Sequence, residues 1–125
     1  MTSMVQTPTN SERLYAINTE LSTAIETVKT HQLRAMLDLE LMKPTTMMYK
    51  NASIRFSIAS YMLPILIRIK TTAETGDMKK TENVIRFHAY QIGAYGTPTE
   101  MDEISKAQKN VKDILDHIIK EHIEK

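Results

Sequence analysis

The residues best able to bind a metal ion or move a proton are four histidines, His31, His88, His117 and His122. None of them stands in the HExxH spacing that brings two imidazoles to one side of a helix. His117 and His122 lie five residues apart, which separates two side chains around an α-helix. Di-metal sites in helical bundles use a Glu-x-x-His motif, and the chain has none. The sequence therefore predicts no metal site and no cofactor.

The other polar residues also show no spacing that would form a catalytic pair. Ser57 and Ser60 have no neighbouring histidine or acid that would activate a serine nucleophile. Asp38 and Glu40 are two residues apart, so their carboxylates diverge on a helix. We expect a protein that is not an enzyme and that has no small-molecule substrate.

The positive charge of the chain is concentrated in its middle. The net charge is +1 overall, but residues 45–95 carry +4, against −1 for residues 1–44 and −2 for residues 96–125. Five basic side chains gather around one expected turn: Arg68, Lys70, Lys79, Lys80 and Arg86. Clusters of lysine and arginine neutralise phosphates. An alternative function is therefore a nucleic-acid-binding accessory protein or regulator that contacts the phosphate backbone through this basic patch.

The lack of cysteine and of a secretory signal bears on the setting of the protein. Without cysteine there is no disulfide framework and no thiolate ligand. The first residues do not have the charged and apolar regions of a secretory signal. Residues 1–9 are small and polar, as expected of a flexible N-terminal tail. These features favour an intracellular, cytoplasmic location or a place within an assembled particle.

Long helices are the elements that must position these side chains. The chain has only three glycines and four prolines, which favours few turns. Apolar residues recur with helical spacing behind capping-box signals at residues 9–12 and 97–100. The predicted fold is all-α, an antiparallel up-down four-helix bundle with unequal helix lengths. We expect helices at about 10–42, 46–75, 78–95 and 98–123 in a single helical domain over residues 10–125.

The central segment allows a second interpretation. Residues 56–67 contain no charge, but the run is shorter than the roughly 20 residues of a membrane-spanning helix. It also contains Pro64, so we predict no membrane segment. Alternating β-branched residues fit strands as well, and the alternative fold is α+β with strands at about 53–60, 64–71 and 83–92. The helical interpretation is favoured because only Pro64 separates the first two of these strands.

The unequal helix lengths are expected to leave one corner uncovered. At 1.5 Å per residue the first two helices would be about 50 and about 44 Å long, and the third only about 27 Å. The end where the first helix meets the second then lacks a covering helix. This methionine-rich corner consists of eight residues: Leu33, Met36, Leu37, Leu41, Met42, Met47, Met48 and Tyr49. Methionine is an adaptable packing residue at binding surfaces, and exposed apolar patches mark interfaces.

The main functional prediction follows from that corner and from the lack of catalytic residues. We expect a non-catalytic α-helical interaction or assembly protein, a self-associating subunit of a larger complex of the filament, capsid or nucleoprotein type. Its partner would be a second copy in a homo-oligomer, or another helical protein. A nucleic-acid backbone is the partner in the alternative function.

Overall fold

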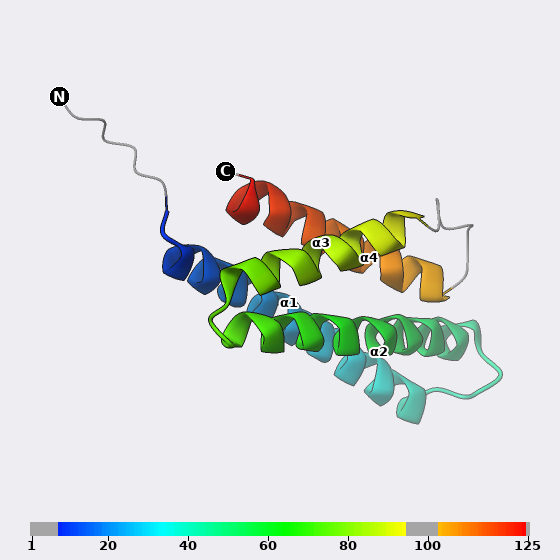
Figure 1. Cartoon of the computed structure of the whole chain (residues 1–125). Helices are drawn as coiled ribbons and strands as arrows, with labels where there is room; N and C mark the ends of the chain where they lie inside the picture. Colours follow the sequence, from blue (N-terminus) through cyan, green and yellow to red (C-terminus); the bar gives the residue numbers. More distant parts are fainter. Residues whose placement is uncertain (1–7, 95–102, 125) are drawn as a thin grey trace.

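The computed structural model describes residues 8–94 and 103–124, and within these ranges it contains no strand. Four α-helices follow one another: α1 (Asn10–Leu41), α2 (Met47–Glu74), α3 (Met78–Ala94) and α4 (Glu103–Ile118). A π-helical turn, η1 (Ile119–Ile123), continues α4. The chain reverses direction from each α-helix to the next (Figure 1). The predicted all-α bundle is confirmed, and the strands of the α+β alternative fall inside α2 and α3.

The helix ends lie close to their predicted positions. α1 ends one residue before the predicted 42, and α2 is one residue shorter at each end than the predicted 46–75. The predicted end of the third helix at 95 and start of the fourth at 98, with the capping box at 97–100, lie outside the described residues. So do the first seven residues of the predicted tail. The last helix changes to π-helical geometry after Ile118, which the sequence pattern did not predict.

A capping box fixes the start of α1. The backbone N–H of Glu12 donates to the Thr9 hydroxyl at 3.1 Å, and the Glu12 carboxylate accepts from the Thr9 backbone N–H at 2.9 Å. Two of the donors that a helix start leaves unpaired are therefore satisfied. The bond from the Thr9 backbone, with a further one from its side chain, holds the pKa of the Glu12 carboxyl below its usual value.

Local signals also set the two described connections. The Thr46 hydroxyl accepts from the backbone N–H of Tyr49 at 3.1 Å and starts α2. Gly76 follows α2 with φ +85°, the left-handed conformation that glycine adopts without a Cβ clash. Asp77 then accepts from the backbone N–H of Lys80 at 2.9 Å and caps α3. Between these points α2 continues through Pro64, whose side chain is exposed.

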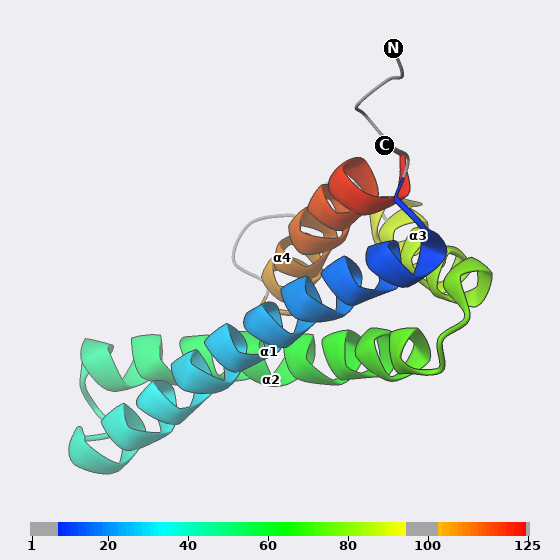
Figure 2. The same ribbon diagram turned by 90° about the vertical axis from the view of Figure 1, so that its left-hand side faces the viewer.

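The two helix pairs have different extents. α1 and α2 form a long hairpin in which α1 crosses α2 obliquely, and α3 and α4 lie side by side across one half of it (Figures 1 and 2). The other half, where α1 passes into α2, projects beyond them (Figure 2). This arrangement agrees with the prediction that a shorter third helix leaves one end of the first two uncovered.

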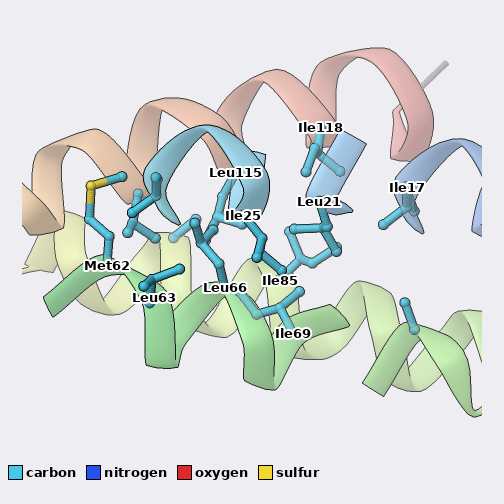
Figure 3. Packing of buried hydrophobic residues seen from close by; sticks show 14 of the residues in the cluster. Ile17, Leu21, Ile25, Met62, Leu63, Leu66, Ile69, Ile85, Leu115 and Ile118 are labelled. Atoms are coloured by element: carbon cyan, nitrogen blue, oxygen red, sulfur yellow. The ribbon is translucent and has the colours of Figure 1, made fainter. Parts of the chain in front are cut away.

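The hydrophobic core lies where all four α-helices meet (Figure 3). The largest fully buried apolar side chains come from each of them: Ile17, Leu21, Leu66, Ile69, Ile85, Val111, Leu115 and Ile118. Burial of one such side chain contributes roughly 1.5–3 kcal/mol. The core therefore holds together the half of the hairpin that α3 and α4 cover.

α2 is as long and as apolar as a membrane-spanning helix. By length and composition it is the one candidate membrane span among the described helices, with a mean hydropathy of 1.3 over its most apolar window. The core helix of a soluble protein meets the same criterion. In this fold Leu63, Leu66 and Ile69 of α2 pack in the core between helices.

Candidate interaction surfaces

The methionine-rich corner occupies the projecting half of the hairpin. We define this distal half as residues 33–52, which α3 and α4 leave uncovered (Figure 2). Leu41 is 83% exposed, Met47 67% and Met48 61%. Leu33, Met36 and Leu37 are each between 43% and 57% exposed, while Met42 and Tyr49 are half-buried. The structure thus places all eight predicted residues on one end of the molecule, six of them well exposed.

Small and polar residues hold the distal half together. Ala35 and Ala52 are its only buried residues, and alanine buries little apolar surface. Just below, the Gln32 amide donates to the Ser60 hydroxyl at 3.1 Å. Arg55 of α2 pairs with Asp38 of α1 at 2.9 Å. The six well-exposed apolar side chains of this region therefore contribute little to holding α1 against α2.

Four exposed charges in the distal half have no ion pair among the described residues, namely Glu40, Arg34, Lys43 and Lys50. Glu40 follows Met36 by four residues on α1, and Lys50 follows Met47 by three residues on α2. Residues at these spacings are neighbours on one face of a helix. Both charged side chains are exposed, and within residues 8–94 and 103–124 neither forms an ion pair.

The predicted basic patch is divided by local ion pairs. Lys70 pairs with Glu74 at 2.7 Å, and Arg86 lies 3.6 Å from Glu82, each one helical turn away. Exposed pairs of this kind contribute little to stability, but they neutralise part of the patch. The three other members, Arg68, Lys79 and Lys80, are exposed and have no ion pair among the described residues.

The sequence analysis did not identify two exposed aromatic side chains of α3. Phe87 is 60% exposed and Tyr90 is 78% exposed. They lie three residues apart on α3, on the side that carries Lys79 and Asn83. The signal was available in the spacing of positions 79, 83, 87 and 90, which places all four on one helix face.

The π-helical turn changes the relation between two histidines. In an α-helix His117 and His122 would diverge, but a π-helix has its hydrogen bonds between residues five apart. His117 Nε2 lies 3.0 Å from Glu20 Oε1, and His122 Nε2 contacts Glu20 Oε2. The two imidazoles therefore join the end of the chain to α1 through one carboxylate. In the described parts of the chain no three potential ligands are placed to hold a metal ion.

His88 is the histidine that sits closest to the predicted basic patch. It lies half-buried on α3, and its ring meets that of Phe87 edge to face with centroids 5.7 Å apart. Burial, together with the nearby positive charge of Arg68, lowers the pKa of His88 below its ordinary value of 6.5. The charge of Arg68 on α2 therefore acts on the half-buried imidazole of α3.

An apolar cavity lies between α1, α2 and α4. It has a volume of about 450 Å³ and its walls include Val28, Ile58, Met62 and Ile114. The Met62 sulfur accepts from the Asn110 amide at 3.8 Å beside it. No serine nucleophile, acid–base pair or cluster of ligands lines this cavity among the described residues.

Comparison with known proteins gives no relative for this arrangement. No protein-family model, curated protein or solved structure matches the chain. The features of this chain that bear on function are its two exposed surfaces, the methionine-rich corner and the side of α3 that carries Lys79, Asn83, Phe87 and Tyr90.

Proposed function

We propose that this protein is a non-catalytic helical assembly subunit that self-associates through the methionine-rich corner. The observation that carries the proposal is the exposure of six large apolar side chains on the half of the hairpin that α3 and α4 leave uncovered. Monomeric soluble proteins rarely expose contiguous apolar patches larger than a few hundred Å². Leu41, Met47 and Met48 gain most from a partner because each is more than 60% exposed.

The size of the surface fits a protein partner. The six exposed fractions together amount to more than three fully exposed large side chains. Exposed apolar surface of this extent is a large part of the roughly 800 Å² that each partner buries in a standard interface. Four of the eight residues are methionines, whose flexible side chains adapt to a facing surface.

Two of the charges beside the patch, Glu40 and Lys50, are complementary and suit a second copy as that partner. A two-fold interface uses the same surface twice, so that a residue of one subunit meets its complement on the other. In an antiparallel pairing of two hairpins, α1 of one copy faces α2 of the other. Glu40 of each subunit can then approach Lys50 of its neighbour, which supplies two intersubunit ion pairs for side chains that have none in the described chain.

Light scattering and sedimentation of the wild type and of Leu37→Asp test the proposal. We expect a monomer–dimer equilibrium for the wild type at micromolar concentration. The buried carboxylate of Leu37→Asp should weaken it on the order of 100-fold, because a charge removed from water without a partner is costly. Tyr15→Asp is the matched control, because Tyr15 is 76% exposed on the same helix but far from the corner.

Charge exchange tests the two-fold arrangement itself. Glu40→Lys and Lys50→Glu should each weaken the dimer, and the double variant should recover it, because the ion pairs are then restored with opposite sign. A wild type that stays monomeric at high micromolar concentration would contradict the proposal. A dimer that Leu37→Asp leaves intact would assign self-association to another surface.

A further inference from the structure

The solvent face of α3 has an unusual composition for one side of a short helix. From Lys79 to Tyr90 the exposed positions of α3 are six: Lys79, Lys80, Asn83, Arg86, Phe87 and Tyr90. The spacing of these positions places them together on one side of the helix. The face holds three cations, one amide and two aromatic rings, and no acid. The nearest carboxylate on α3, Glu82, is half-buried at its margin and pairs with Arg86.

Neighbouring groups extend this face and orient one of its rings. Arg68 of α2 is exposed and close enough to His88 for its charge to act on that imidazole. The His88 ring meets the Phe87 ring edge to face, which restricts the aromatic ring beside the basic side chains. Tyr90, one helical turn further along, is 78% exposed.

We propose that this outer face of α3 binds single-stranded nucleic acid, with Phe87 and Tyr90 stacking on bases and Lys79 and Lys80 lying along the phosphates. Proteins that bind single strands combine a positively charged track with aromatic side chains on which bases stack. The exposed face from Lys79 to Tyr90 is about 16 Å long at 1.5 Å per residue. That length accommodates a few nucleotides.

Single strands suit this face better than a duplex or a protein does. Bases in a duplex already stack on one another, so exposed aromatic rings gain nothing from them. A protein partner that covered the face would have to supply carboxylates for Lys79 and Lys80 as well as an apolar surface for the rings. The phosphates and bases of a single strand supply both at regular intervals. The proposal is independent of self-association, because α3 lies over the half of the hairpin opposite the distal half (Figure 2).

Fluorescence anisotropy with labelled oligonucleotides tests the proposal. The probes are oligo(dT) and oligo(U) of about 12 nucleotides, within the site sizes of single-strand binders, and a duplex of the same length. We expect both single strands to bind, the duplex to bind more weakly, and Phe87→Ala and Tyr90→Ala each to lower the affinity about 5- to 100-fold. Tyr15→Ala is the matched control, because that ring is equally exposed on α1.

Salt dependence and a conservative variant separate the contribution of the lysines to phosphate binding from that of the aromatic rings to base stacking. Replacing Lys79 and Lys80 by Gln should weaken every oligonucleotide alike and reduce the slope of log affinity against log salt by about 0.7 for each phosphate that the protein no longer neutralises. Phe87→Leu keeps an apolar side chain but removes the ring, and should weaken binding as Phe87→Ala does.

Three results would overturn the inference. The first is that no oligonucleotide binds at about 50 mM salt. The second is that the duplex binds as tightly as the single strands, and the third is that Phe87→Ala and Tyr90→Ala both leave the affinity unchanged. If the aromatic variants change the oligomeric state and not the oligonucleotide affinity, the face is a protein contact and the inference is wrong. Comparing oligo(dT) with oligo(U) decides whether DNA or RNA is the preferred strand.

Discussion

The two halves of the α1–α2 hairpin are built from similar residues but have opposite surroundings. In the half that α3 and α4 cover, Ile17, Leu21, Leu66 and Ile69 are fully buried. In the distal half only Ala35 and Ala52 are buried, while leucines and methionines of comparable size face solvent. The difference shows that the exposure of an apolar side chain is set by the length of the helices that cover it. An apolar stripe that continues past its cover is left exposed to solvent, which is why we propose the distal half as an interaction surface.

Removing the same leucine atoms from each half gives the largest expected contrast. Leu66→Ala should lower the free energy of unfolding by about 2–5 kcal/mol, because it opens a cavity in the core. Leu37→Ala should cost less than about 0.5 kcal/mol in the monomer, since Leu37 is 48% exposed. Urea denaturation at low protein concentration measures both.

Protein concentration provides the control for this pair. Self-association stabilises the folded state by mass action, so the cost of Leu37→Ala should grow as the concentration rises while that of Leu66→Ala stays constant. Equal costs for the two variants in the monomer would contradict the contrast between the halves.

Enlarging a buried alanine tests how the distal half is held together. Ala52→Leu should destabilise the monomer by about 1–3 kcal/mol, because the added atoms force α1 away from α2. Ser53→Leu is the matched control, since Ser53 is the next residue and is exposed. If Ala52→Leu leaves the stability of the monomer unchanged, the distal half does not depend on close packing at this position.

Much of this contrast could be predicted from the sequence. The helical spacing of apolar residues and the capping signal at residues 9–12 depend on local geometry, so the helices and their described ends were predicted closely. The exposed corner followed from relative helix lengths, which boundaries alone determine. The membership of the methionine-rich corner was therefore predicted as a set, although its role stays a prediction.

The parts that sequence reasoning missed depend on contacts between distant residues. The π-helical turn that brings His117 and His122 to Glu20 replaces the α-helical spacing on which the argument against their proximity rested. Local pattern does not determine such a turn, because the tertiary partner on α1 is about a hundred positions away. The aromatic pair on α3 was missed for a different reason, since apolar residues at helical spacing usually belong to a core.

The smallest expected effect concerns pH and the helix that covers one half of the hairpin. The pKa of His88 is lowered in the folded protein by burial, with a further contribution from Arg68. The unfolded chain therefore binds the proton more readily than the folded one. Above the ordinary value of 6.5 this has no effect, and as the pH falls from there through the lowered folded pKa the fold loses stability.

The test compares the wild type with His88→Gln, so that pH effects from the rest of the protein cancel. Between about pH 7.5 and about pH 5, the wild type should lose more stability than His88→Gln, which cannot take up the proton. Arg68→Gln should give an intermediate loss, since it removes the nearby positive charge but leaves the burial. Denaturation midpoints that shift in parallel for wild type and His88→Gln would show that the pKa of His88 is not lowered in the folded protein. A difference confined to this pH range would place the pH sensitivity in the cover formed by α3, because the distal half has no histidine.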